Sequence, residues 1–391
     1  MKRPISLSVI GLASIVTIAA CSSSGTTSAS GTPASAAAGS SSAAGSASAS
    51  SGVVATAQAE LNKYTAKPPF TAPGAAFNAK PLAGKTIAIV AIDQTTPSLF
   101  LAAQGAKAAA AAAGLKTTLF DAKDNPSEMT TGVEQAIAAH ASAIILDGIA
   151  VQLVTSQLKQ AAAAHIPVVN ADNGQSIAPS GDGLYANATP NFSLSGELAA
   201  DAAIVSTNGQ AKAILVGTDG ITPGAELLTG LTQGMKTCST CQIVDTKSVQ
   251  IQDWFTTLTS TTTSLVQTNP TANIMLPIYV TMAMQMIPGI AQADASSRIK
   301  LFSTSAPPDA AKLLASTPSL GGLVGDSDTE VGWYSVDYAM RGMLKLAAPS
   351  NDTTVPIRYL TPETVKADGT SEDALYGDGY VAGFKQLWGL G

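Results

Sequence analysis

The 391-residue chain has little charge, few aromatic side chains and almost no cysteine or histidine. Charged residues make up only 12% of it and the formal net charge is −6. A basic surface that neutralises nucleic-acid phosphates is therefore not expected. The sequence also lacks a G-x-x-x-x-G-K, a G-x-G-x-x-G and an H-E-x-x-H motif, and the Ser-His-acid order of a hydrolase. We therefore expect no cofactor, no enzymatic activity and no nucleic-acid partner.

The N-terminus has the pattern of an export signal. Lys2 and Arg3 precede an apolar run over residues 5–20, which is shorter than the roughly 20 residues of a membrane span. The run ends in Ile18-Ala19-Ala20-Cys21, which resembles the bacterial lipobox, where the cysteine is acylated and becomes the mature N-terminus. We expect residues 1–20 to be a lipoprotein signal peptide and Cys21 to anchor an extracytoplasmic protein to the cell membrane. The alternative is a buried thiol at the end of a short helix.

A tether and an ordered or half-ordered lead-in are expected to follow. Residues 21–56 are almost entirely Ser, Ala, Gly and Thr, and such a segment buries too little apolar surface to offset its chain entropy. It predicts a flexible tether. Residues 57–83 form a lead-in that is interrupted by Pro68-Pro69 and Pro73-Gly74. The remaining length exceeds what one hydrophobic core usually supports, so two compact units are expected.

From residue 84 onward, short apolar strands alternate with helices. Residues 86–92 form a continuous apolar run, typical of a strand buried on both faces, and an Ala-rich helix is expected over 97–113. Further strands are expected at 117–120, 143–146, 167–170, 211–216, 242–249, 273–276, 298–302 and 321–324. The alternation restarts after Asn191, which predicts two similar lobes, each a parallel sheet flanked by helices. Ligands of such sheets bind beyond the carboxyl ends of the strands, so the cleft between the lobes is the expected site.

The order of these segments resembles the ribose-type, or type I, periplasmic solute-binding proteins. The resemblance covers residues 85 to about 346. It rests on Thr96-Pro97 after the first strand, Asp121 to Pro126 after the second, Asp147 and Asp172 after the third and fourth, the Asn191 helix start, and Gln252-Asp253-Trp254. It implies two doubly wound lobes joined by a three-segment hinge near Thr189, Ser327 and Asn351. The expected N-terminal lobe is 84–189 plus 328–354, and the expected C-terminal lobe is 190–327 plus 355–391.

The resemblance implies a monomeric binding lipoprotein that closes on a small polar ligand and delivers it to the permease of an ABC transporter. A sugar or sugar-like compound is the expected ligand. Three alternatives stay open. The first is a receptor lipoprotein that signals to a membrane kinase, and the second is a binder of an amino acid or another non-sugar solute. The third is an exported hydrolase, which would need a nucleophile and a base within reach of each other.

The candidate ligand contacts are polar and aromatic residues beside the ends of the predicted strands. They are Thr95, Thr96, Asp147, Asp172, Asn173, Asn191, Trp254, Tyr279, Ser305 and Asp326. Carboxylates accept hydrogen bonds from hydroxyls, and Trp254 offers a flat face to a pyranose. Turn or helix-capping chemistry is the alternative for the polar residues, and core packing for Trp254. The family's aromatic pair is replaced by Ser98 and Leu99, and its arginine by Leu227, so the identity of the sugar does not carry over.

Cys238 and Cys241 form a C-x-x-C sequence between a predicted helix and a predicted strand. With Cys21 acylated, these two are an even number in an exported chain, which favours a structural disulfide. A zinc site would need two further ligands, and neither His140 nor His165 lies nearby in the sequence. No metal is expected.

Overall fold

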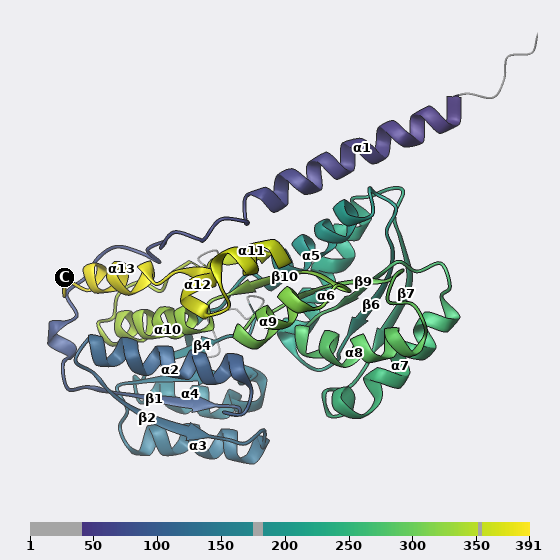
Figure 1. Cartoon of the computed structure of the whole chain (residues 1–391). Coiled ribbons are helices and arrows are strands. Elements are labelled where there is room, and N and C mark those ends of the chain that lie inside the picture. The colour runs from purple at the N-terminus through teal and green to yellow at the C-terminus, as the bar shows by residue number, and fades with distance from the viewer. Residues whose placement is uncertain (1–40, 175–182, 351–353) are drawn as a thin grey trace, which may run out of the picture. The chain divides into compact units, whose positions relative to one another are not determined.

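A computed structural model describes residues 41–174, 183–350 and 354–391, with side chains from residue 51 onward. The predicted signal peptide, residues 1–20, and the lipidation site Cys21 lie outside the described residues. The rest forms two α/β lobes, each built on its own mainly parallel sheet (Figure 1). The predicted fold class is confirmed.

The first lobe contains a five-stranded parallel sheet with the order β2-β1-β3-β4-β5. Its strands are β1 (Thr86–Ala91), β2 (Lys116–Asp121), β3 (Ala143–Asp147), β4 (Val168–Ala171) and β5 (Leu184–Ala188). Its helices are α2 (Pro97–Ala112), α3 (Pro126–Ala138), η2 (Val151–Val154), α4 (Thr155–Ala163) and α10 (Asp328–Met343). Side chains of β1 alternate between the two faces, so Ile87 and Ile89 pack in one core with α2 and α10, and Val90 packs in the other with α3 and α4. Both faces are covered, which explains the uninterrupted apolar run.

The second lobe contains a six-stranded sheet with the order β11-β10-β9-β8-β6-β7. Its strands are β6 (Lys212–Gly217), β7 (Gln242–Ser248), β8 (Ile274–Pro277), β9 (Lys300–Thr304), β10 (Leu320–Asp326) and β11 (Ile357–Leu360). Only the β10–β11 pair is antiparallel. Its helices are α5 (Phe192–Ser206), α6 (Thr222–Lys236), η3 (Ile251–Asp253), α7 (Trp254–Thr268), α8 (Val280–Gln292), α9 (Pro308–Ser316), α11 (Pro362–Asp368) and α12 (Glu372–Tyr376).

The chain crosses between the lobes at two described places. Thr189 follows β5 of the first sheet and precedes α5, and Ser327 joins β10 of the second sheet to α10 on the first. The third predicted crossing, near Asn351, lies outside the described residues. Just beyond it, the backbone N–H of Val355 donates to the carbonyl of Thr189 at 3.0 Å. The chain therefore lies beside the first crossing when it returns to the second lobe as β11.

The C-terminal segment is shared between the lobes. β11 joins the second sheet, whereas α13 (Gly379–Leu387) packs against α10 on the first lobe. The rings of Trp333 and Trp388 stack there with centroids 5.5 Å apart. The prediction placed all of 355–391 in the C-terminal lobe. In the structure, α13 instead packs its aromatic residues against the core of the first lobe. The lead-in of 57–83 also reaches this core, where Phe70 contacts Phe384 edge to face.

The helix α1 (Ser41–Asn62) corrects the prediction of a flexible tether that extends to residue 56. Its C-terminal half is held because Ala57 is buried against Ile204 and Cys238. Leu61 is likewise buried, in the core of the second lobe. The remainder of the expected tether, 21–40, lies outside the described residues. Within the described part of the chain, no helix has the length and apolarity needed to cross a membrane.

The C-x-x-C sequence lies between α6 and β7, as the prediction placed it. Cys238 and Cys241 are joined as a disulfide in the structure. Cys238 is 2% exposed, so the bridge fixes a turn that is already packed against α1 and α5.

Candidate functional site

A cavity of about 440 Å³ opens at the carboxyl ends of the strands of both sheets. Loops after β1, β2, β3 and β4 form its wall in the first lobe, and residues after β6, β8 and β9 form the wall in the second. The volume is within the range of about 300 to 1,000 Å³ that is common for small-molecule sites. The two halves of the wall belong to different sheets, so a ligand in this cavity touches both lobes.

The loop from β1 to α2 presents a carboxylate that its neighbours hold in place. Asp93 accepts hydrogen bonds from the backbone N–H and hydroxyl groups of both Thr95 and Thr96. Burial acts to raise the pKa of Asp93, but these four bonds outweigh it and hold the pKa below its ordinary value. Asp93 is therefore an ionised group of the cavity wall at neutral pH. Thr96 also lines the cavity, whereas Thr95 does not and serves to fix Asp93.

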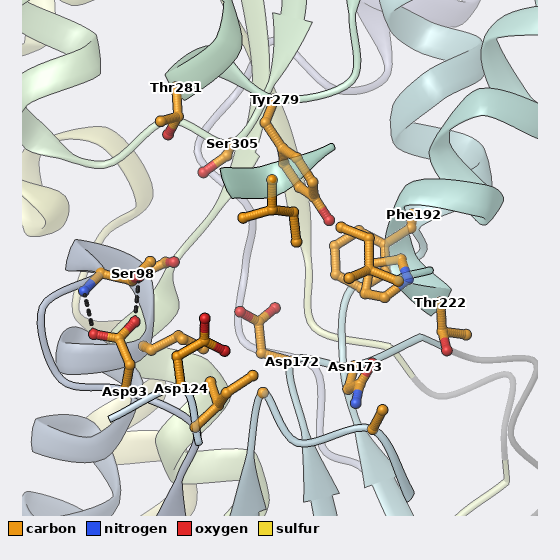
Figure 2. Close-up of a pocket in the computed structure, with 18 of the residues that line it drawn as sticks. Asp93, Ser98, Asp124, Asp172, Asn173, Phe192, Thr222, Tyr279, Thr281 and Ser305 are labelled. Atoms are coloured by element: carbon orange, nitrogen blue, oxygen red, sulfur yellow. Dashed lines mark hydrogen bonds between the residues drawn. The ribbon is translucent and has the colours of Figure 1, made fainter. Parts of the chain in front are cut away.

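Asp172 and Asn173 follow β4 and enter the cavity from the same side as Asp124 (Figure 2). Asp172 has φ 53° and Asp124 has φ 56°, in the left-handed region that costs most residues energy. The backbone of Asn173 is held by the side chain of Asn170, whose Nδ2 donates to the Asn173 carbonyl at 3.2 Å. These strained turns point the polar groups toward the space between the lobes. Strained backbone is often found where functional groups are positioned in this way.

Asn173 has an unfulfilled donor at this wall. Its side chain is 3% exposed and its Nδ2 has no hydrogen-bond partner. A buried amide donor without a partner costs free energy unless another molecule supplies an acceptor. A hydroxyl or carboxyl oxygen of a ligand would supply one.

The second lobe contributes an aromatic wall. Trp254 begins α7 and its Nε1 donates to the carbonyl of Val249 at 3.1 Å, which leaves the ring face to line the cavity. The Tyr279 ring lies 5.9 Å from the Trp254 ring, centroid to centroid. Figure 2 shows the Tyr279 hydroxyl extending toward Asp172, with Ser305 and Thr281 on the same side. Ser305 has φ 65°, so this polar residue too sits in a left-handed turn, after β9.

Two further carboxylates enter the cavity at the second crossing. Asp326 ends β10 and Asp328 begins α10, and both line the cavity. Oδ2 of Asp326 is buried without a hydrogen-bond partner. Burial raises the pKa of both groups well above the ordinary range, and the proximity of Asp172 raises the pKa of Asp326 further. These carboxylates stand on either side of Ser327, where the chain passes from the second sheet to α10.

Burial also raises the pKa of Asp172, to about 7. Asp147 lies behind it, 1% exposed, with both side-chain oxygens unpartnered. Burial, followed by the charge of Asp172, raises the pKa of Asp147 well above its ordinary value.

The structure brings most of the predicted contact residues together. Those that line the cavity are Thr96, Asp172, Asn173, Trp254, Tyr279, Ser305 and Asp326. Thr95, Asp147 and Asn191 do not line it. Asn191 caps α5, where its side chain accepts from the N–H of Leu194 at 3.0 Å. Asp147 faces the first-lobe interior beside α2 and α10 because the last residue of β3 still points into the helix-covered face.

Sequence reasoning missed several residues of the wall. Asp93, Asp124 and Asp328 supply carboxylates, and Phe192 supplies an aromatic ring. The position after each strand was a usable signal for Asp93 and Asp124, since both stand in loops at the carboxyl ends of β1 and β2. Phe192 is the first residue of α5, and its position resembles that of an ordinary core residue in the sequence.

The carboxylates are spread around the cavity rather than gathered at one point. Among the described residues, no group of three or more His, Cys, Asp or Glu side chains is placed to hold a metal ion. The wall therefore offers separate hydrogen-bond acceptors on both lobes, flanked by aromatic faces.

Two α/β lobes that surround a cavity at their strand ends define a class of ligand-binding proteins. Residues 87–343 match the family model described as a periplasmic binding protein domain, and the chain belongs to this family. The resemblance drawn from the sequence is thereby confirmed. No curated protein matches the chain.

Solved structures with a similar fold come from several bacteria. One is the 5-methylthioribose transporter solute binding protein of Thermotoga lettingae, with 18% identity and a TM-score of 0.67, covering 78% of this chain and 98% of that one. Another is an ABC transporter solute binding protein of Mycobacterium smegmatis with bound glycerol, at 17% identity and TM-score 0.63, covering 73% and 97%. A third, from Actinobacillus succinogenes with bound D-allose, has 17% identity and TM-score 0.63, covering 72% and 99%. At these identities the likeness shows the fold alone.

Proposed function

We propose that the protein is an extracytoplasmic binding lipoprotein that captures a small polar solute and presents it to the permease of an ABC importer. It acts by binding and not as an enzyme. The observation that carries the proposal is the cavity whose wall is divided between two lobes, with hydrogen-bonding groups from each and an aromatic face from the second. A sugar or sugar-like compound fits because hydroxyls match the acceptors and an aromatic face suits an apolar ring face.

Binding is coupled to closure of the lobes. A ligand in the cavity completes its contacts only when both walls approach it, so the bound state favours the closed arrangement. We assign the lobes to 84–189 plus 328–354 and 190–327 plus 355–391, with α13 of the last segment packed on the first lobe. Thr189 and Ser327 are then the pivots. Closure gives the permease a shape that differs from that of the empty protein.

The proposed contact residues come from both lobes. Thr96, Asp172 and Asn173 act from the first lobe, and Trp254, Tyr279 and Ser305 act from the second, with Asp326 at the crossing. Thr95, Asp147 and Asn191 support these residues from behind. The protein binds as a monomer without a cofactor, and the oxidised Cys238–Cys241 pair stabilises a turn remote from the cavity.

A thermal-shift screen of the purified protein against sugars, polyols and amino acids tests the binding function. A ligand present at 100 times its Kd stabilises the folded state by about 2.7 kcal/mol, which gives a clear rise in Tm. Sugars or polyols should give the largest shifts. If no member of the panel shifts Tm, the proposal of a solute-binding role is wrong, and a response to amino acids alone would identify the non-sugar alternative.

The anchor and the importer role need separate measurements. Labelling with a fatty-acid analogue should mark the wild type and leave Cys21→Ala unlabelled, and Cys21→Ala should be released from the membrane fraction. Deletion of the protein should abolish uptake of its ligand by the cell. Normal uptake together with a lost ligand response would instead support the receptor that signals to a kinase.

A further inference from the structure

The cavity wall carries five carboxyl groups. Its carboxyl groups are those of Asp93, Asp124 and Asp172 in the first lobe, and of Asp326 and Asp328 beside the second crossing. No Lys, Arg or His of the described residues lines it. The neighbouring segment 175–182 likewise contains no basic residue in its sequence. The imbalance is therefore a property of this whole part of the chain.

The described arginines have other partners. Arg341 pairs with Asp337 and Arg358 pairs with Asp368, and neither arginine lines the cavity. Arg298 donates to the carbonyl of Ala272. Lys123 is next to Asp124 in the chain, but it is exposed and is not part of the wall. Closure of the lobes therefore cannot bring a described arginine of this protein to the carboxylates.

A second observation points to a ligand that also carries hydroxyl groups. Nδ2 of Asn173 lies on the wall, buried and without an acceptor, so it requires an oxygen from the ligand. Close to it, the Trp254, Tyr279 and Phe192 rings supply faces that attract both an apolar ring face and a positive charge. The wall thus combines acceptors for a cation, a donor for an oxygen and aromatic faces.

We propose that the ligand is an organic cation with a hydroxylated body, of the amino-sugar or amino-polyol class, and that the carboxylates of the cavity bind its ammonium group. This inference rests on the proposed function, because it names the solute that the same cavity takes. If the lobes close on a neutral ligand, these carboxyl groups stay without a positive partner in a space with less water, which disfavours their ionised form. A ligand ammonium supplies that partner and donates charge-assisted hydrogen bonds to the carboxylates of the wall, which are stronger than neutral ones.

Pairs of ligands that differ only in charge test the inference on the unmodified, full-length protein. We would compare D-glucosamine with D-glucose, D-galactosamine with D-galactose, and D-mannosamine with D-mannose by titration calorimetry, with N-acetyl-D-glucosamine as an uncharged amide. The amines should bind at least tenfold more tightly than their neutral partners, and the preference should weaken between 50 mM and 500 mM NaCl. Equal or tighter binding of the neutral sugars would overturn the inference and leave the proposed function standing. Failure of every amine to bind would also overturn the inference, whereas the proposed function is decided by the wider thermal-shift screen.

A charge-neutral substitution provides an independent measurement. Asp326→Asn should lower the ratio of amine to neutral affinity at least threefold. Asp309→Asn makes the same substitution at an exposed position on α9 that does not line the cavity, and should leave the ratio unchanged. An unchanged ratio in Asp326→Asn would contradict the assigned role of this carboxylate. If Asp326→Asn does not fold, the ligand pairs on the wild-type protein still decide the inference.

Discussion

The hydroxyl of Ser327 donates a 2.8 Å hydrogen bond to Oε1 of Glu372, which joins the crossing between β10 and α10 to the short helix α12. The same carboxylate accepts from the backbone N–H of Thr329 at 2.7 Å and from the Thr329 hydroxyl. Ser327 in turn caps α10 by accepting from the N–H of Glu330. One carboxylate from the C-terminal segment thus fixes the start of α10, where the chain passes from one lobe to the other.

Replacement of Glu372 by alanine should loosen this crossing. Three hydrogen bonds to one carboxylate are lost, two of them from groups at a helix start, and we expect a loss of about 2 to 4 kcal/mol in the free energy of unfolding. Urea denaturation of the purified protein measures the loss. Asp373→Ala is the matched control, because Asp373 is the next residue of the same helix and is exposed. If both variants lose the same free energy of unfolding, the loss comes from a general weakening of α12 and not from the hydrogen bonds of Glu372.

The contact between α2 and α10 depends on glycine. A Cβ on Gly332 would lie 2.3 Å from the carbonyl oxygen of Ala102, far closer than two such atoms approach. Gly332→Ala should therefore force the helices apart and destabilise the first lobe by about 3 kcal/mol. Gly379→Ala is the control, since nothing lies within 4 Å of its Cβ position and alanine favours a helix. If Gly332→Ala unfolds at the same urea concentration as the wild type, this tight contact does not exist in solution.

The alternation of strands and helices could be predicted because the central strands are buried on both faces. A run such as Ile87 to Val90 has no polar residue to interrupt it, so its pattern is unambiguous. The strands β5 and β11 were missed, because each is only four or five residues long and carries polar residues, among them Asn187 and Arg358. Arg358 is buried because Asp368, at the end of α11, supplies its counter-charge and the carbonyls of Thr65 and Leu375 accept its hydrogen bonds. Local sequence does not reveal such a partner.

The candidate site could be predicted as a region, though not residue by residue. Polar groups that follow strands reach the cavity where the loop projects outward, as at Asp172 and Ser305, both of which adopt left-handed turns. Asp147 is instead the last residue of its strand, and its side chain points into the interior of the first lobe. The direction in which such a side chain points depends on the residue at which its strand ends, and amino-acid composition does not determine this. Asp328 was missed because it resembles an ordinary acidic residue in the first turn of a helix.

The hydroxyl of Tyr279 should contribute to ligand affinity and little to folding. Tyr279→Phe keeps the ring that packs beside Trp254 and removes only the oxygen that extends into the cavity. We expect the ligand found in the screen to bind about fivefold more weakly, which corresponds to about 1 kcal/mol, while Tm of the empty protein stays within 2 °C of the wild type. Titration calorimetry and thermal unfolding measure the two quantities. An unchanged Kd would remove the hydroxyl from the proposed contacts.

Folding stability should decline as the pH rises toward neutrality, and Asp172 should account for part of the decline. Burial raises its pKa to about 7 in the folded protein, whereas an aspartate in an unfolded chain titrates near 4. Between these values the folded state holds a proton that the unfolded state has lost, so the stabilisation is complete below pH 4 and is lost as the pH rises through 7. Asp147, Asp326 and Asp328 face the same region with raised pKa values and act in the same direction.

The variant Asp172→Asn isolates this contribution, because asparagine fits the left-handed backbone and does not titrate. Urea unfolding at pH 5 and pH 8 should show a smaller difference in free energy for Asp172→Asn than for the wild type, with the remaining decline due to the three neighbouring carboxylates. Asp309→Asn changes an exposed carboxylate and should keep the wild-type difference. A wild type that is more stable at pH 8 than at pH 5 would contradict the raised pKa, since the folded state would then favour the charged form of these groups.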